Sequence, residues 1–170
     1  MFYLMEGDFI LPDVLKPNLK VVFCGTAAGD KSAMRKAYYA GPGNKFWPIL
    51  YRIGLTPVLF EPKDYQRLLD YNIGLTDLAK GVSGADSKLK KSNFDAESLK
   101  DKILMYEPNV LCFNGKKAAQ EFMGRKDIDY GLQNKRIGKT LLFVAPSTSG
   151  AANGFWNEKY YIQLAVMLQC

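Results

Sequence analysis

The chain has 170 residues, which is long enough for one domain with a hydrophobic core, and we expect a single domain over 1–170. Hydrophobic residues make up 48% of the sequence and aromatic residues 13%, which is typical of a compact globule and not of a disordered chain. There is no histidine, which excludes histidine-based acid–base catalysis and histidine metal ligands, and the net charge of +6 favours a polyanionic partner.

The predicted elements alternate between apolar strands and amphipathic helices. Three short apolar runs that end at glycine or proline lie at 20–25, 110–115 and 140–147. Their continuous hydrophobicity predicts strands that are buried on both faces, as in a parallel sheet. Helical patterns occupy four other segments, at 44–54, 64–71, 95–106 and 157–168. Asn44 is a candidate cap of the first of these helices, and Ser92 and Asn93 are candidate caps of the third.

This alternation predicts an α/β fold with three layers, α/β/α, around a short, mostly parallel and doubly wound sheet. The polar, basic segments 81–92 and 124–138 are predicted to be exposed loops. In such sheets ligands bind beyond the carboxyl ends of the strands, where the strand order reverses. The segments that follow the predicted strands, 25–30, 114–116 and 145–150, are therefore expected to form one site.

The cysteines and the hydropathy of the sequence indicate the cellular compartment. The three cysteines, Cys24, Cys112 and Cys170, stand far apart without metal-ligand spacing, and two of them lie in apolar runs. No apolar run approaches the roughly 18 to 20 residues that span a bilayer, and the N-terminus lacks a basic region typical of a secretion signal. We expect a cytoplasmic protein with no membrane span and no metal site.

The first predicted strand ends in Gly25-Thr-Ala-Ala-Gly29, a turn that has almost no side chains. Such a turn lets backbone N–H groups approach a ligand closely. It lacks the glycine spacing of a dinucleotide-binding loop and the Gly-Lys-Ser/Thr of a phosphate-binding loop. The alternative interpretation is a tight strand-to-helix turn that binds nothing.

Two further segments carry candidate binding groups. Tyr38 and Tyr39 precede a Gly-Pro-Gly turn and Asn44, and an aromatic ring there could cover a planar ligand. The alternative is that both tyrosines are core residues and Asn44 is only a helix cap. The loop 145–154 is rich in hydroxyl groups and glycine, which suits contacts with a phosphate backbone but equally suits a solvated connection.

The order and spacing of five segments resemble the uracil-DNA glycosylase superfamily, and most closely its mismatch-specific uracil/thymine branch. These segments read LKPNLKVVFCGTAAG, AGPGNKFWPILYRIGLT, LLDYNIGLTDLA, FNGKKAAQEF and VAPSTSG, and the likeness extends over about 15–168. The resemblance implies the fold of that superfamily and an enzyme that cleaves N-glycosidic bonds in DNA.

The resemblance also implies which residues meet the base. The aromatic residue that stacks on a flipped base falls on Tyr39, the residue that reads the polar edge of the base falls on Asp77, and the serine of the first segment falls on Ser32. The substrate-binding residues expected on this basis and from the strand ends are Gly25, Thr26, Ala27, Ala28, Ser32, Tyr39, Asp77, Asn114 and Ser147.

The sequence departs from the family pattern at the positions of the catalytic motifs. The branch has Gly-x-Asn-Pro-Gly in its first motif, where the Asn positions the attacking water, but this chain has Ala27 and Ala28 there. The Asn-Pro-Ser of the last motif is Ala145-Pro-Ser147 in this chain, and Thr148–Ala151 replaces the arginine-bearing wedge. The catalytic Asn of the family therefore cannot be carried over.

Two residues are candidates for positioning the water. They are Asn44, which we slightly favour although its role as a helix cap competes, and Asp30, the carboxylate nearest the first turn. Asp77 is a third possibility, but a carboxylate that faces a uracil carbonyl is unfavourable unless it is turned away or protonated. If Asp77 contacts the base, it should accept from a ring N–H. The sugar develops oxocarbenium character, so water needs only weak activation, and backbone N–H groups can stabilise the charge on the departing base.

The base must first leave the duplex, which costs a few kcal/mol and least at a mismatch. The loop after the third predicted strand would then hold the gap open, with Asn153 or Phe155 as the filler. The DNA-binding residues that we expect are Lys116, Ser147, Thr148, Ser149 and Asn153. For the lysines at 88–91 a solvated surface is the simpler interpretation.

The leading functional prediction is a monomeric, monofunctional DNA glycosylase that removes uracil, and other deaminated bases as well, in base excision repair. Its partner is DNA that contains uracil or a mismatch, and it needs neither a metal nor an organic cofactor. No lysine stands at the place of a nucleophile in the first motif, so a lyase step is not indicated. The alternative is a protein of the same fold that binds abasic or damaged DNA without turnover, since Ala27 and Ala145 lack polar side chains.

Overall fold

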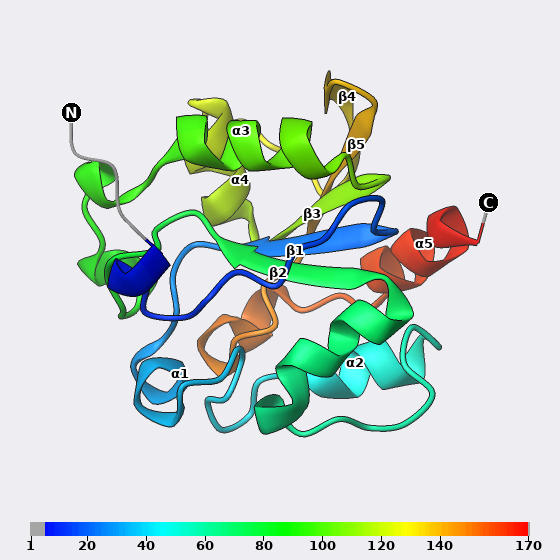
Figure 1. Cartoon of the computed structure of the whole chain (residues 1–170), viewed down its shortest axis with the longest axis horizontal. Helices are drawn as coiled ribbons and strands as arrows, with labels where there is room; N and C mark the ends of the chain where they lie inside the picture. Colours follow the sequence, from blue (N-terminus) through cyan, green and yellow to red (C-terminus); the bar gives the residue numbers. More distant parts are fainter. Residues whose placement is uncertain (1–5, 170) are drawn as a thin grey trace.

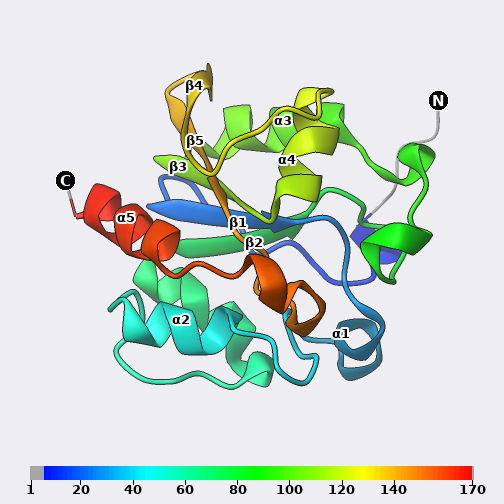
Figure 2. The same ribbon diagram turned by 180° about the vertical axis from the view of Figure 1, so that it is seen from behind.

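The computed structural model describes residues 6–169, in which a five-stranded sheet separates two layers of helices (Figures 1 and 2). The strand order is β2-β1-β3-β5-β4. The strands are β1 (Val21–Gly25), β2 (Ile73–Asp77), β3 (Val110–Asn114), β4 (Gly131–Ile137) and β5 (Thr140–Ala145). All neighbours are parallel except β4, which pairs antiparallel with β5 at one edge. The predicted three-layer fold with a mostly parallel sheet is confirmed.

The helices divide between the two faces of the sheet. One face is covered by α1 (Asp30–Arg35), α2 (Phe46–Arg52) and α5 (Lys159–Leu168), and the other by α3 (Ala96–Tyr106) and α4 (Lys116–Met123) (Figure 1). Short 3-10 helices complete the structure: η1 (Glu6–Asp8), η2 (Pro62–Tyr71), η3 (Asp86–Lys88), η4 (Lys91–Asn93) and η5 (Gly150–Phe155). No helix among residues 6–169 is long and apolar enough to cross a membrane.

The central strands β1 and β3 are buried at every position because helices cover both of their faces. In β1, Val21 and Phe23 pack in the core on the side of α2 and α5, whereas Val22 and Cys24 pack in the core on the side of α3. Cys24 and Cys112 are buried free thiols, and Cys170 lies outside the described residues.

The strand order reverses at the carboxyl end of β1, which is where sheets of this kind bind ligands. The strand β2 lies on one side of β1 and β3 lies on the other, so the connections that leave these strands diverge between β1 and β3. Gly25 ends β1 and Asn114 ends β3 at this point, with Asp77 beside Gly25 and Ala145 beside Asn114.

Two local predictions were wrong, and one strand was not predicted. The segment predicted as an exposed loop over 124–138 contains the edge strand β4, whose outer side pairs with no described strand. Its side chains are mostly exposed and the register of its pairing with β5 shifts between Leu132 and Arg136, so its polar sequence does not show a regular strand pattern. The strand β2 was not among the apolar runs because its sequence includes glycine, threonine and aspartate. The cap of α3 is Asp95, which accepts from the N–H of Ser98 at 2.9 Å, rather than Ser92 or Asn93.

Candidate active site

The candidate active site begins at the turn after β1. The carbonyl groups of Gly25 and Thr26 accept hydrogen bonds from the N–H groups of Leu78 and Ala79, which ties this turn to the segment after β2. The side chain of Thr26 is buried and donates to Asp86 at 2.6 Å, so it points away from the crevice. The N–H groups of Ala27 and Gly29 have no hydrogen-bond partner within residues 6–169. They are therefore available to a ligand, as the bare sequence predicts.

Tyr38 and Tyr39 have different environments. Tyr38 is a core residue with 2% exposure, whereas Tyr39 is half-buried and has a φ of 53°, in the left-handed region that bulky residues rarely adopt. The Tyr39 ring stacks on Phe46 of α2, with ring centroids 4.1 Å apart and planes inclined by 30°. Its hydroxyl is buried and has no hydrogen-bond partner in the described structure, and burial raises the pKa of this phenol well above its ordinary value. Tyr39 is thus a neutral ring with one supported face.

Asp77 ends β2 directly beside Gly25 and is 5% exposed. A methyl group added at Gly25 would lie 2.8 Å from Oδ1 of Asp77 and 3.4 Å from the hydroxyl of Tyr39, so a glycine is required at this position. Burial raises the pKa of Asp77 to about 6, while Lys80 acts in the opposite direction. The bare turn, a supported aromatic ring and a buried carboxyl group therefore meet at one strand end.

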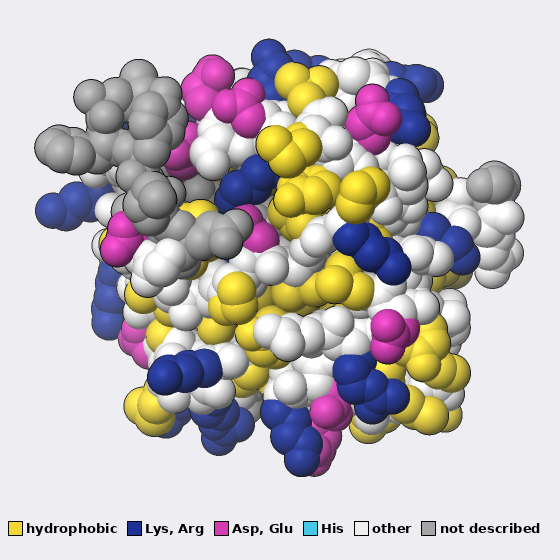
Figure 3. Space-filling model, in the orientation of Figure 1, with side chains coloured by type: hydrophobic (Ala, Val, Ile, Leu, Met, Phe, Trp, Pro, Cys, Tyr) yellow, Lys and Arg dark blue, Asp and Glu magenta, His cyan; other side chains and the backbone are white. Residues whose placement is uncertain are grey.

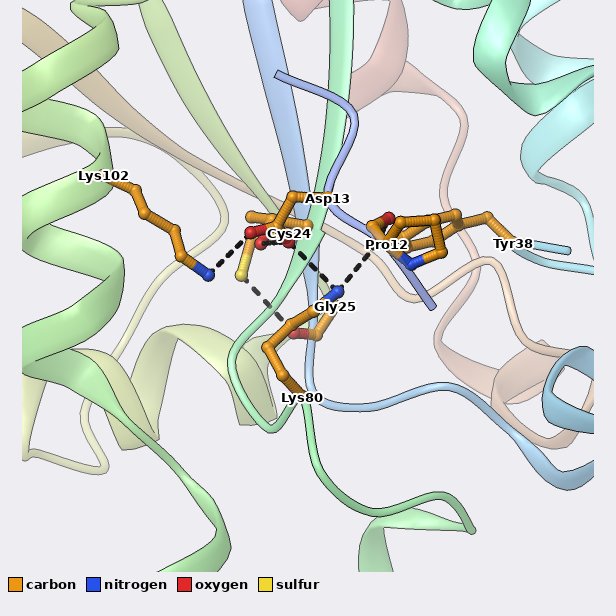
Figure 4. A network of polar contacts seen from close by, with 8 residues as sticks. Pro12, Asp13, Cys24, Gly25, Tyr38, Lys80 and Lys102 are labelled. Atoms are coloured by element: carbon orange, nitrogen blue, oxygen red, sulfur yellow. Dashed lines mark hydrogen bonds and ion pairs between the residues drawn. The ribbon is translucent and has the colours of Figure 1, made fainter. Parts of the chain in front are cut away.

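A buried charge cluster that the sequence did not predict acts electrostatically on Asp77. Figure 4 shows its members Asp13, Lys80 and Lys102. Asp13 pairs with Lys80 at 3.0 Å and with Lys102 at 2.7 Å, and it accepts from the hydroxyl of Thr76 at 2.6 Å. Although burial opposes ionisation, Lys80 and Lys102 hold the pKa of Asp13 below its ordinary value. Lys80 also donates to the hydroxyl of Tyr38 at 2.9 Å. These groups come from separate segments and form no local motif, so no sequence signal could have found them.

Asn44 stands one residue before Lys45, which occupies the N-terminal cap position of α2 and makes no capping bond with its side chain. The Oδ1 of Asn44 accepts from the N–H of Phe46 at 3.0 Å, so Asn44 supplies a capping-type hydrogen bond from the preceding position. The backbone N–H of Lys45 donates to the carbonyl of Thr148 at 2.8 Å, so the start of α2 lies against the loop after β5. A role of Asn44 in positioning water stays a prediction.

The other two predicted residues of the first loop face different ways. Asp30 begins α1, is exposed, and lies near Gly84, where a methyl group would be 3.9 Å from its carboxylate oxygen. Ser32 is buried in α1, and its hydroxyl accepts from the backbone N–H of Ala40 at 3.0 Å. Ser32 therefore supports the backbone that carries Tyr39.

The loop after β5 is held by Asn114. The Asn114 amide donates to the hydroxyl of Thr148 and accepts from its backbone N–H, both at 2.9 Å, and both residues are buried. Ser147 is half-buried and accepts from the N–H of Ser149 at 3.2 Å. The side chain of Thr148 is only 1% exposed, so a direct DNA contact from it would require the loop to move.

Farther along this loop, exposed groups surround η5. Lys45 donates to the side chain of Asn153 and lies 5.5 Å from the ring centroid of Trp156. Phe155 projects with 74% exposure. At the start of α4, the ammonium group of Lys116 lies 4.4 Å from the ring centroid of Tyr130.

Comparison with known proteins agrees with this arrangement. A family model described as "Uracil DNA glycosylase superfamily" matches residues 12–165, a span that includes every strand end described above. The chain is also similar to the solution NMR structure of a "putative Uracil DNA glycosylase" from Methanosarcina acetivorans. That match has a TM-score of 0.62 and 25% sequence identity, and it covers 94% of this chain and 97% of the other.

Proposed function

Because this chain belongs to the uracil DNA glycosylase superfamily, whose members are DNA glycosylases, we propose that it removes uracil from DNA by hydrolysing the N-glycosidic bond. The observation that carries this proposal is the meeting of three groups at the end of β1 and β2. These groups are the bare turn from Gly25, the ring of Tyr39 on Phe46, and the buried carboxyl group of Asp77. Together they suit a planar base that carries polar groups on one edge.

The chemistry assigns a part to each group. As the glycosidic bond breaks, negative charge develops on the base, and the free N–H groups of Ala27 and Gly29 can stabilise it, with each such donor contributing about 3 kcal/mol in comparable sites. Stacking on Tyr39 contributes about 1 to 3 kcal/mol. Asn44 and Asp30 are the candidates for positioning water. Asn44 precedes Lys45, whose backbone N–H donates to the carbonyl of Thr148 in the loop after β5.

The loop after β5 is suited to hold the gap that a flipped base leaves. Phe155 is a large apolar side chain that is mostly in solvent, and Asn153 beside it is held by Lys45. Lysine and arginine side chains are spread over the visible face and do not form one patch (Figure 3). The proposed activity belongs to base excision repair.

A single-turnover assay with the protein in excess tests this proposal. The labelled oligonucleotides carry uracil opposite guanine, opposite adenine or unpaired, with hypoxanthine and thymine mismatches alongside, and alkali then cleaves the abasic sites. We expect cleavage at uracil, fastest where it is mismatched or unpaired. Cleavage of none of these bases, together with tight binding to abasic duplex, would replace this proposal with the lesion-binding alternative.

Two variants with the same side-chain change serve as the control for that assay. Tyr39→Ala removes the supported ring, and Tyr51→Ala removes a 50% exposed tyrosine on α2. The proposal expects loss of rate in the first variant and not in the second.

A further inference from the structure

The position of Asp77 raises a question of protonation that the proposed function leaves open. Asp77 lies on the same face of the sheet as Tyr39, because Gly25 approaches the carboxyl group and the Tyr39 hydroxyl together. Any base that stacks on Tyr39 at this strand end therefore places an edge near that carboxyl group. Whether the group is charged decides which edge it accepts.

Asp77 has no ion-pair partner within residues 6–169. The two nearby cations, Lys80 and Lys102, are both engaged by Asp13. Burial opposes the charged form of Asp77 most and Asp13 also opposes it, while Lys80, Lys102 and a backbone hydrogen bond from Gly25 favour it. The hydroxyl of Tyr39 on the same face and the thiol of Cys24 on the opposite face are buried neutral groups, and burial raises the pKa of each well above its ordinary value.

The two protonation states recognise different edges. A neutral carboxyl group presents one acceptor and one donor side by side, which is the pattern of a carboxamide. Uracil and hypoxanthine each present a ring N–H next to a ring carbonyl, so the neutral group can make two hydrogen bonds with either base. A carboxylate can accept only from the N–H, and it then faces the carbonyl oxygen with a repulsive charge.

We propose that Asp77 reads the base as a neutral carboxylic acid, with its C=O accepting from the ring N–H and its O–H donating to the adjacent ring carbonyl. This inference rests on the proposed function, and it names the substrate class as bases with an N–H beside a carbonyl group. Burial at the end of β2 and the engagement of both lysines by Asp13 keep the carboxyl group protonated in the complex. Asp77 is then a specificity-determining residue.

The pH profile of excision tests the inference. We expect the single-turnover rate on uracil to fall as pH rises above about 6, by roughly tenfold per pH unit, because only the neutral form binds productively. Asp77→Asn keeps the donor and acceptor pattern without a titratable group, so its rate should be constant over this range and exceed that of the natural chain about a hundredfold at pH 8. Asp70→Asn makes the same change at an exposed position on η2 and should retain the natural profile.

The opposite profile would overturn the inference. A rate that rises as Asp77 ionises would assign it to accepting a proton or positioning water as an anion. A stably folded Asp77→Asn variant that is as slow as Asp77→Ala at every pH would also overturn it. In oligonucleotides, 3-methyluracil lacks the ring N–H and should not be excised, whereas its excision at the rate of uracil would contradict the two-bond recognition.

Binding of free uracil separates failure of this inference from failure of the proposed function. Backbone amide shifts in NMR spectra of the labelled chain report this binding at pH 5.5 and pH 8. Binding that weakens with pH in the natural chain but not in Asp77→Asn supports the inference even if no DNA is cleaved. Excision with a flat pH profile would overturn the inference and leave the glycosylase function standing. Neither binding nor excision would overturn both.

Discussion

The backbone of Tyr39 is held in a conformation that costs on the order of 1 to 3 kcal/mol, and its neighbours show how the fold maintains it. The carbonyl of Tyr38 accepts from the indole N–H of Trp47 at 3.1 Å, and the N–H of Ala40 donates to Ser32. The chain is thus fixed on both sides of Tyr39. Such strain in a bulky residue is typical of functional sites, and here it places the ring against Phe46.

Removing the ring should lower the rate of excision without unfolding the protein. We expect Tyr39→Ala to reduce the single-turnover rate on uracil by about tenfold to a hundredfold, which corresponds to 1 to 3 kcal/mol of lost stacking. Tyr39→Phe should stay within a few-fold of the natural rate, because the hydroxyl has no hydrogen-bond partner within the described structure. A Tyr39→Phe variant as slow as Tyr39→Ala would show that the hydroxyl, and not the ring, contacts the substrate.

The two roles of Asn44 can be separated by one substitution. Serine is as good a helix cap as asparagine, so Asn44→Ser should preserve the bond to Phe46, whereas Asn44→Ala should cost about 0.5 to 2 kcal/mol of stability in urea unfolding. If Asn44 also positions water, the rate of Asn44→Ser should fall although its stability does not. An unchanged rate in Asn44→Ser would restrict this residue to capping and leave Asp30 as the candidate.

At the scale of elements, the site depends on contacts between chain segments that follow different strands. Asn114 at the end of β3 holds the loop after β5 through both atoms of its amide, and Lys45 before α2 donates to the same residue, Thr148. Gly115 follows with a φ of 105°, and a methyl group there would lie 3.2 Å from Cβ of Ser147. The close approach of these loops therefore needs both the amide and the glycine.

Loss of the Asn114 amide should loosen this junction. Asn114→Ala leaves the buried N–H and hydroxyl of Thr148 without their partner, so we expect it to lower the free energy of unfolding by about 1 to 3 kcal/mol in urea. Asn134→Ala, at an exposed position on β4, is the matched control and should change stability by less than about 0.5 kcal/mol. Equal stability of the two variants would mean that the loop is held by its other contacts.

At the scale of the whole molecule, the chain carries a net positive charge, and a small cluster of charged groups lies largely buried inside it. The net charge of +6 is spread over the surface, whereas Asp13, Lys80 and Lys102 lie largely buried between the N-terminal segment, the end of β2 and α3. This cluster and Asp77 make stability depend on pH in opposite directions. Because folding lowers the pKa of Asp13, this residue stabilises the folded chain at pH values above its pKa in the unfolded chain. That stabilisation is lost as the pH falls through the pKa of the folded state.

Asp77 should destabilise the folded chain as pH rises. Its pKa is raised from 3.8 to about 6 on folding, so between these values the folded state binds more protons than the unfolded state and stability falls with increasing pH. Asp77→Asn removes this penalty, and we expect its stability advantage over the natural chain to grow between pH 4 and pH 7.5 by on the order of 2 to 3 kcal/mol in urea unfolding. An advantage that does not change with pH would show that Asp77 titrates normally in the folded protein.

The class of fold and the general place of the site can be inferred from the sequence alone. Continuous apolar runs predict buried parallel strands because two layers of helices leave no polar face, and the bare turn from Gly25 marks a strand end that a ligand can approach. The spacing of five segments indicated the superfamily, to which the chain belongs. The polar edge strand β4 was missed because most of its side chains are exposed and its register shifts between Leu132 and Arg136, so its sequence shows no regular apolar pattern.

The electrostatic state of the site depends on tertiary contacts that the sequence does not reveal. Asp77 is an ordinary aspartate in the sequence. Burial raises its pKa in the folded chain and the charge of a distant residue raises it further, while Lys80 and Lys102 act in the opposite direction. That residue, Asp13, is separated by 63 positions from Thr76, which donates to it. Local sequence patterns extend over a few turns of helix or a strand, so they cannot report a pKa or a left-handed tyrosine that contacts from distant segments impose.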